Sequence, residues 1–310
     1  MKRNIYSKLW MIFFVLMGAA CTNQVEDAIP VSGQPIGFSV QSDWKEIPNT
    51  RSDDGKTQFV KDDEIQIFGF HTSPSGEVKK FMYDVKKTNY GQIVTYDGNS
   101  SWNYTPKRFW PKEGKLDFFA SYPYNSIRND ADNHTMIYDQ TANSMKQDLL
   151  WGVSTENDCA AKNNVVITMK HALAKVNIFI DKSLNYIGTV MFSAYTAGRF
   201  TKTDDSGIPA WEFNNDDKTT FNAVFGYDDT IRDDFGTSLT VFILPGNITG
   251  FQMFDVPGNK IAASGEISNR IKDLKFEAGK AYNLKISSNG VRKKNTNSRS
   301  IAMSVRCVSE

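Results

Sequence analysis

The sequence predicts an all-β protein made of β-sandwich layers. Almost every apolar stretch alternates with a period of two, which is the spacing of a strand that buries one face. Short clusters rich in Gly, Pro, Asn and Asp separate these stretches and indicate turns. No segment carries a sustained apolar stripe of period 3.6 between helix caps, so stacked sheets are favoured over helical or mixed architectures.

The predicted strands fall into two groups along the chain. Those before residue 157 are PIGFSV (35–40), DEIQIFGF (63–70) and KLDFFASY (115–122). Those that follow are NVVITM (164–169), AKVNIFI (174–180), SLTVFIL (238–244) and KAYNLKI (280–286). Most of them place β-branched or aromatic residues at alternate positions, as half-buried strands do. Turn signals between them include SPSG (73–76), PKEG (111–114) and DDSGIP (204–209).

A boundary between two domains is predicted near the polar segment NDCAAKNN, residues 157–164. Of the 310 residues, the 290 that follow residue 20 exceed what one sandwich needs and are a comfortable length for two domains. We therefore divide this part of the chain into a first domain at 31–163 and a second domain at 164–288. Residues 289–310 are predicted to form a polar, basic linker and a last strand.

The N-terminus has the pattern of an export signal. Lys2, Arg3 and Lys8 precede an apolar run that ends in the small residues of MGAAC. The run, residues 9–20, is shorter than the about twenty residues that a membrane-spanning helix needs. A cleaved signal is therefore favoured over a permanent transmembrane helix.

Small residues directly before Cys21 are typical of bacterial lipoproteins. We expect residues 1–20 to be a signal peptide, Cys21 to be lipidated, and residues 21–30 to tether the protein to the outer membrane. Several acyl chains on one residue would give stable anchoring. Simple secretion is the alternative, because Gly18 stands where such signals usually have leucine.

Charge and motifs argue against catalysis and nucleic-acid binding. The chain has a net charge of +1, and removing residues 1–20 takes away three positive charges, which leaves about −2. A nucleic-acid-binding domain is expected to be basic instead. The sequence has no metal-ligand cluster, nucleophile elbow or glycine loop for phosphates. We therefore expect no nucleic-acid partner, no enzyme activity, no metal and no cofactor.

The histidines and cysteines give no stronger signal. His171 lies beside apolar residues at the start of a predicted strand, and only His71 and His134 could join it in a site, so a structural role is expected. In an exported protein Cys159 and Cys307 could form a disulfide. Their separation in sequence leaves that pairing open.

Five motifs, in order, resemble those of the fimbrillin family. They are RSDDGKTQFVKDDEIQIFGF, WNYTPKRFWPKEGKLDFFASYPY, DLLWG, VVITMKHALAKVNIFI and FEAGKAYNLKI. The resemblance covers about residues 30–287 and implies two tandem transthyretin-like β-sandwich domains behind a lipoprotein signal peptide. It also implies a subunit or anchor of a type V pilus on a Gram-negative surface. Glu26 and Asp27, which follow Cys21, are similar to signals that send lipoproteins to the outer face of the outer membrane.

The aromatic block around Trp102, Trp110 and Tyr122 is the most specific part of this resemblance. Large apolar rings on two strands around a turn are suited to a sandwich core. Core packing is therefore the expected role of these rings. A platform on which sugars stack is the alternative.

Arg51 lies in a polar loop after the first predicted strand and resembles the site where pilus-forming fimbrillins are cut, between Arg51 and Ser52. In that family, cleavage removes the first strand and opens an apolar groove, which a strand of a neighbouring subunit fills. Exposed polar loops are preferred sites of proteolysis on physical grounds as well. The alternative is an ordinary surface loop.

The C-terminal segment has the pattern of the strand that such a groove would accept. Ile301, Met303, Val305 and Cys307 alternate with other residues behind a basic stretch at 289–299. We predict that these four residues form a donated strand and that the basic stretch is its linker. An edge strand within the same chain is the alternative.

Two functions of different class follow. The first is a fimbrillin-like structural protein that joins other pilus subunits by strand exchange, is held in the outer membrane through Cys21, and contributes to adhesion. The second is a surface lipoprotein that does not polymerise and binds a glycan or host ligand on exposed aromatic rings. Trp151 and Trp211 are the candidates for those rings.

Overall fold

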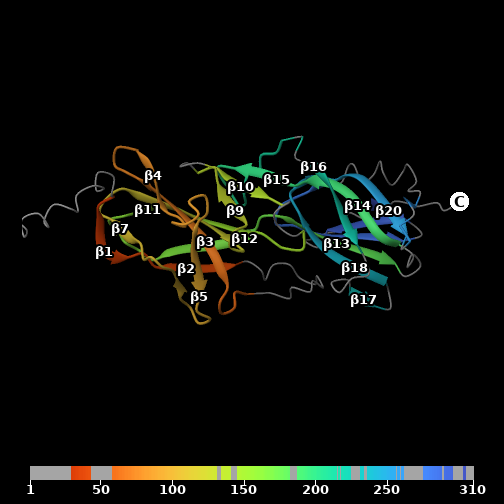
Figure 1. The fold of residues 1–310 in the computed structure, drawn as a ribbon, viewed down its shortest axis with the longest axis horizontal. Helices are drawn as coiled ribbons and strands as arrows, with labels where there is room; N and C mark the ends of the chain where they lie inside the picture. The colour runs from red at the N-terminus through yellow and green to blue at the C-terminus, as the bar shows by residue number, and fades with distance from the viewer. Residues whose placement is uncertain are drawn as a thin grey trace, which may run out of the picture.

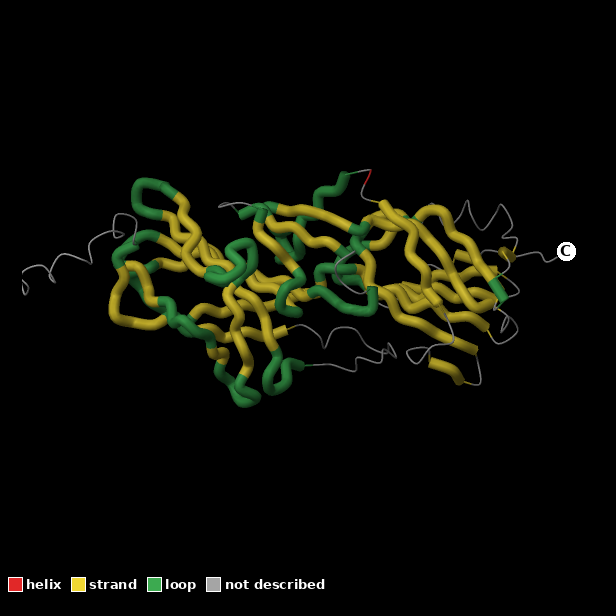
Figure 2. The backbone as a smooth tube through the Cα atoms, viewed as in Figure 1, coloured by secondary structure: helices red, strands yellow, loops and turns green. Residues whose placement is uncertain are grey.

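The computed structural model describes most of the chain between residues 29 and 304. The described residues are 29–42, 58–130, 134–140, 145–181, 187–214, 216, 218–224, 231–233, 236–255, 257–258, 260–261, 275–287, 290–295 and 303–304. Every named element among them is a strand, so the predicted all-β class is confirmed. Strands from the two halves of the chain gather at opposite ends of an elongated molecule (Figures 1 and 2). In this part of the chain we find no helix whose length and apolar character would suit a bilayer crossing.

The first half is built on a sheet of eight strands. Its order is β2-β12-β11-β8-β3-β5-β6, and β4 also pairs with β3. The pairing of β2 with β12 is parallel, and the pairings of β3 and β11 with their neighbours are antiparallel. The bounds are β2 Phe38–Ser42, β3 Glu64–Thr72, β4 Val78–Met82, β5 Gln92–Tyr96, β6 Trp102–Asn103, β8 Lys115–Tyr122, β11 Leu150–Asp158 and β12 Val165–His171.

The central strands β3 and β8 bury both of their faces. Ile65 and Ile67 of β3 point into one cluster, and Phe68 and Phe70 point into another, because successive strand residues face opposite sides. We call the first cluster the first core; it contains Ile36, Phe38, Ile65, Ile67, Phe81, Met82, Val94, Trp102, Tyr104, Trp110, Leu116, Phe118, Ala120, Leu150, Cys159, Val165, Ile167 and Met169. We call the second the junction core; it contains Phe68, Phe70, Phe119, Ile127, Met136, Tyr138, Leu149, Trp151, Ala172, Leu173, Phe200, Phe242 and Leu244.

The second half packs two sheets around one core. The six-stranded sheet has the order β17-β18-β13-β23-β24-β25, and the four-stranded sheet has the order β16-β14-β20-β21. Alternate residues such as Val176, Ile178 and Ile180 of the first sheet meet Val190 and Phe192 of the second. The bounds are β13 Ala174–Asp181, β14 Ile187–Tyr195, β16 Lys218–Val224, β17 Ile231–Asp233, β18 Gly236–Ile243, β20 Thr249–Asp255, β21 Lys260–Ile261, β23 Ala281–Ser287, β24 Gly290–Asn295 and β25 Met303–Ser304.

A three-stranded sheet connects the two halves. Its order is β15-β10-β9, and its bounds are β9 Ile127–Asn129, β10 Met136–Asp139 and β15 Ala197–Phe200. β9 and β10 come from the first half of the chain, whereas β15 follows β14 of the second half. Met136 pairs with Phe200 across it, and both side chains lie in the junction core. The two halves are therefore joined by packing and by strand pairing.

The first sheet extends past the predicted boundary at 163. β12 pairs with β2 and β11, and its Val165 and Ile167 lie in the first core. The polar segment at 157–164 comprises the end of β11 and the connection to β12, and its backbone turns where the amide of Ala160 donates to the carboxylate of Asp158 at 2.8 Å. A hairpin turn and an interdomain linker have similar polar composition, so the sequence pattern does not separate them.

The predicted linker at 289–299 also contains a strand. Gly290–Asn295 forms β24, which pairs antiparallel with β23 from Tyr282–Asn295 to Ser287–Gly290. Its sequence, GVRKKN, has almost no apolar residues at alternate positions. Backbone hydrogen bonds hold such a strand, and basic side chains are common where strands border solvent. The hydrophobic period therefore gives no sign of it.

We expect the Trp151→Ala substitution to lower the free energy of unfolding by about 3–5 kcal/mol, because it leaves a large cavity in the junction core. Trp151 is 1% exposed and contacts Phe119 at 5.9 Å and Phe200 at 4.8 Å between ring centroids. Denaturant unfolding followed by circular dichroism measures the change. Val166→Ala is the control, because Val166 is 56% exposed. Equal effects of the two substitutions would contradict the central position of Trp151.

Candidate functional site

The segment that begins the described chain crosses from one strand layer to the other. β1 (Val31–Pro35) pairs antiparallel with β7 (Phe109–Pro111), and β2 pairs parallel with β12. Between them the amide of Ile36 donates to the Arg108 carbonyl at 2.9 Å, and the amide of Val165 donates to the Gly37 carbonyl at 2.9 Å. A side chain at Gly37 would lie 2.6 Å from the Asn164 amide oxygen, so glycine permits this close crossing.

The same segment fills part of the first core. Ile36 is 2% exposed and Phe38 is 5% exposed. The Phe38 ring packs edge to face on Phe118 at 5.2 Å and on Tyr104 at 5.7 Å. The Tyr104 hydroxyl donates to the Ile36 carbonyl at 2.7 Å. Loss of this segment would open an apolar groove between β7 and β12, which we call the first-strand groove.

The residues predicted to release and replace this segment lie mostly outside the described residues. The residues outside the described part of the chain are Cys21, Arg51, Ser52, Ile301, Val305 and Cys307. Met303 is described, and it pairs with Lys293 of β24 at the end of the six-stranded sheet of its own chain. This pairing is what the alternative interpretation predicts, namely that Met303 belongs to an edge strand within its own chain.

The histidines and the described cysteine have local structural partners. His71 shares a hydrogen bond of 2.9 Å with the Glu113 carbonyl, and His171 pairs with the Asp148 carboxylate. Cys159 is a free thiol buried in the first core, and burial, with a smaller contribution from the Asp158 carboxylate, raises the pKa of this thiol to about 11. Among the described residues, no three His, Cys, Asp or Glu side chains are placed to hold a metal ion.

The two tryptophans proposed as exposed platforms have different environments. Trp151 is buried in the junction core, so its expected exposure is wrong. The physical reason is that β11 buries both of its faces at this point. An alternation of apolar and polar residues predicts only one buried face. Trp211 is half-buried, and its indole N–H donates to the Ala172 carbonyl at 3.0 Å. Trp211 lines a pocket on the second half of the molecule.

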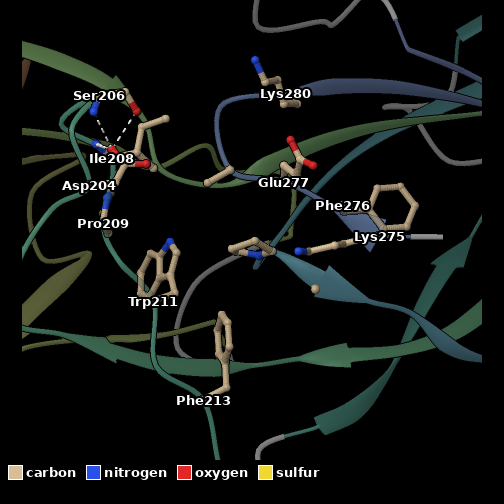
Figure 3. Close-up of a pocket in the computed structure, with 13 residues that line it drawn as sticks. Asp204, Ser206, Ile208, Pro209, Trp211, Phe213, Lys275, Phe276, Glu277 and Lys280 are labelled. Atoms are coloured by element: carbon tan, nitrogen blue, oxygen red, sulfur yellow. Dashed lines mark hydrogen bonds between the residues drawn. The ribbon is translucent and has the colours of Figure 1, made fainter. Parts of the chain in front are cut away.

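This pocket has a cavity volume of about 450 Å³ and lies between two loops (Figure 3). One wall comes from the segment 204–213, which carries Trp211 and Phe213. The other comes from β19 (Gly246–Asn247), β22 (Lys275–Phe276) and the residues 277–280 that precede β23. The sequence analysis indicated the first wall by the turn signal DDSGIP and by Trp211 as a candidate ring. The second wall joins it through pairing of β19 with β22, which is a contact distant in sequence.

A hydrogen-bonded turn fixes the first wall. The Asp204 carboxylate accepts hydrogen bonds from the Ser206 amide at 2.9 Å, the Ser206 hydroxyl at 2.7 Å and the Ile208 amide at 3.0 Å. Desolvation raises the pKa of the Asp204 carboxyl, but the hydrogen bonds from Ser206 and Ile208 outweigh it, so the net pKa is lowered. The Lys170 ammonium also donates to the Ser206 carbonyl. These hydrogen bonds hold the turn that forms the first wall.

Comparison with known proteins identifies the family. The sequence profile of the fimbrillin-like family matches residues 50–303. This match covers most of the chain, so the protein belongs to the fimbrillin-like family.

Similar proteins include a fimbrium subunit and two proteins of known crystal structure. The fimbrium subunit Fim1C of Phocaeicola vulgatus is 30% identical over 121 residues, which are 38% of this chain and 31% of that protein. The chain thus matches less than a third of this relative. A candidate cell adhesion protein from Bacteroides uniformis, whose crystal structure is known, has a TM-score of 0.51 at 18% identity, with 84% of this chain and 96% of that chain covered. A second candidate cell adhesion protein, from Bacteroides ovatus, has a TM-score of 0.49 at 12% identity, with 90% and 99% covered. The Bacteroides uniformis structure supports the fold.

We expect Phe38→Ala to lower the free energy of unfolding by about 3–5 kcal/mol, because it empties the part of the first core between Tyr104 and Phe118. Ser39→Ala is the matched control, because Ser39 is exposed on the same strand. Thermal and denaturant unfolding measure both variants. Equal stability of the Phe38→Ala and Ser39→Ala variants would mean that the first strands contribute little to the core.

Proposed function

We propose that the chain is a structural component of a surface fimbrium, a subunit or anchor of a type V pilus assembled by β-strand donation. The observation that carries the proposal is the placement of the segment 29–42, which precedes Arg51 and fills the first-strand groove. Membership of the fimbrillin-like family supports the same class. The protein acts through its surfaces in this proposal and needs no catalytic residues.

The exchange would proceed in two steps. Cleavage between Arg51 and Ser52 separates residues 29–42 from the rest of the chain. Their departure uncovers the apolar side chains that Ile36 and Phe38 contact, and leaves the backbone groups of β12 without their partner. A strand from a neighbouring subunit then restores both, through main-chain hydrogen bonds and alternate apolar side chains. In our proposal the segment 300–308 is that strand.

The lipid at Cys21 fits the same scheme. Before cleavage, Cys21 and the first strands belong to one chain, so the protein is held at the outer membrane. After cleavage, the remainder is released from the lipid and can enter a polymer. A chain in which Arg51 is left uncut would stay anchored, which is the role of an anchor subunit.

Arg51→Ala tests the cleavage step. We expect the native protein from cell surfaces to begin at Ser52 and the variant to begin at acylated Cys21, as mass spectrometry of the N-terminal peptide would measure. We also expect the high-molecular-weight ladder of the native protein on gels to be lost in the variant. Arg128→Ala, at an exposed arginine of the first half, is the control for the loss of an arginine as such. A native chain that begins at acylated Cys21 would indicate an anchor or a self-contained surface lipoprotein, and a ladder in the Arg51→Ala variant would contradict the exchange scheme.

Truncation after residue 299 tests the donated strand. We expect the truncated chain to lose the ladder, because no strand remains to fill the next groove. Its unfolding midpoint should change little, since β25 makes only two described register pairs with β24. The opposite result, a large fall in stability with the ladder retained, would assign this segment to an edge strand within the chain.

A further inference from the structure

The pocket beside Trp211 has one aromatic wall. Trp211 and Phe213 are two residues apart, and their rings are nearly parallel, with an interplanar angle of 16° and a centroid distance of 6.3 Å. Phe213 also stacks on Tyr195 at 4.2 Å and 12°. Both rings pack closely against β15 at Gly198. A side chain added at Gly198 would be 2.8 Å from the Trp211 ring and 3.0 Å from the Phe213 ring.

Trp211 is held in this orientation from behind. Its indole N–H donates a hydrogen bond to the Ala172 carbonyl, and the Phe200 ring packs edge to face on the Trp211 ring at 4.9 Å between centroids. The polar atom of the ring therefore points into the protein, and the apolar body of the ring is what lines the pocket. A rigid aromatic surface of this type offers contact area at little cost in side-chain entropy.

The opposite wall is polar. Lys275 and Glu277 lie across the cavity from Trp211 and Phe213, with Lys280 beyond them (Figure 3). Lys275 and Glu277 are exposed. Ammonium groups only donate hydrogen bonds and a carboxylate only accepts them, so this wall presents both kinds of partner. Asp204, on the aromatic side, adds a second carboxylate, so the positive charges of the two lysines are balanced.

We propose that this pocket binds one pyranose ring of a glycan, with an apolar face of the sugar on Trp211 and its hydroxyl groups on Lys275 and Glu277. A sugar ring has a flat face of C–H bonds and a rim of hydroxyls that both donate and accept, which matches one aromatic wall and one mixed polar wall. Sugar hydroxyl groups can form hydrogen bonds with this wall, whereas an apolar peptide side chain cannot. The volume of about 450 Å³ is within the ~300–1,000 Å³ range of small-ligand pockets.

Saturation-transfer NMR on the chain without its expected signal peptide, residues 21–310, tests this site. The probes are methyl glycosides of glucose, galactose, mannose, fucose and N-acetylglucosamine, together with N-acetylneuraminic acid. We expect at least one of them to show transfer to its ring C–H protons. Trp211→Ala should weaken that binding about tenfold, since it removes the stacking surface.

Trp211 also packs on Phe200, so its variant could be destabilised for reasons unrelated to binding. Lys275→Ala and Glu277→Ala avoid this difficulty because both positions are exposed, and each should weaken binding while the circular dichroism melting curve stays unchanged. Phe109→Ala and Lys107→Ala are the matched controls at an exposed aromatic and an exposed lysine of the first half. No transfer to any of the six sugars overturns the proposal. Transfer that survives at full strength in the Trp211, Lys275 and Glu277 variants overturns it too.

Discussion

The burial of both faces of β3 and β8 is the constraint on which the rest of the structure depends. A strand that buries one face can border solvent, but Phe68 and Phe70 need a second apolar partner as much as Ile65 and Ile67 do. The second half of the chain supplies that partner through Phe200 of β15 and Phe242 of β18. The connection between β12 and β13 is Ala172 and Leu173, and both are buried in the same core. The two halves are thus locked by packing, and the connection between them is too short and too buried to act as a flexible linker.

The first strands, β1 and β2, are held in the structure differently from the central strands β3 and β8. β2 is the last strand of its sheet, so it has a pairing partner on one side only, β12. The segment that contains β2 contributes Ile36 and Phe38 to the first core, and Ile29 and Val40 pack against that core, whereas β3 and β8 contribute to two cores. In the proposed exchange this segment, which is held by the β1–β7 pairing, the β2–β12 pairing and its buried side chains, would leave the edge of the sheet without breaking the pairings among the other strands. The apolar groove it leaves would be costly to expose to water, which gives a replacement strand its driving force.

The sequence predicted those features that local periodicity encodes, and missed those that depend on contacts between distant segments. Alternation in DEIQIFGF and AKVNIFI is a direct consequence of sheet geometry, so the all-β class and most long strands could be predicted. The burial of Trp151 could not, because the partner that covers it, Phe200, is far away in the chain. β24 was missed because its sequence, GVRKKN, lacks the apolar alternation that predicts a strand, although its backbone pairs with β23. The pocket was missed for a similar reason: Trp211 was a candidate ring, but its polar counterpart, Lys275 and Glu277, is distant in sequence and is placed by contacts such as the β19–β22 pair.

Ala172 connects the two proposed sites. The indole of Trp211 is hydrogen-bonded to the Ala172 carbonyl, and Ala172 directly follows β12, which is the strand that pairs with β2. The amide of Ala172 in turn donates to the Leu149 carbonyl at 2.8 Å, next to β11. A pulling force on a ligand bound in the pocket would therefore be transmitted to the first sheet through these hydrogen bonds and through the junction core. In a polymer joined by strand exchange, that force would reach the exchanged strand along β12, so a rigid junction is what an adhesive structural subunit requires.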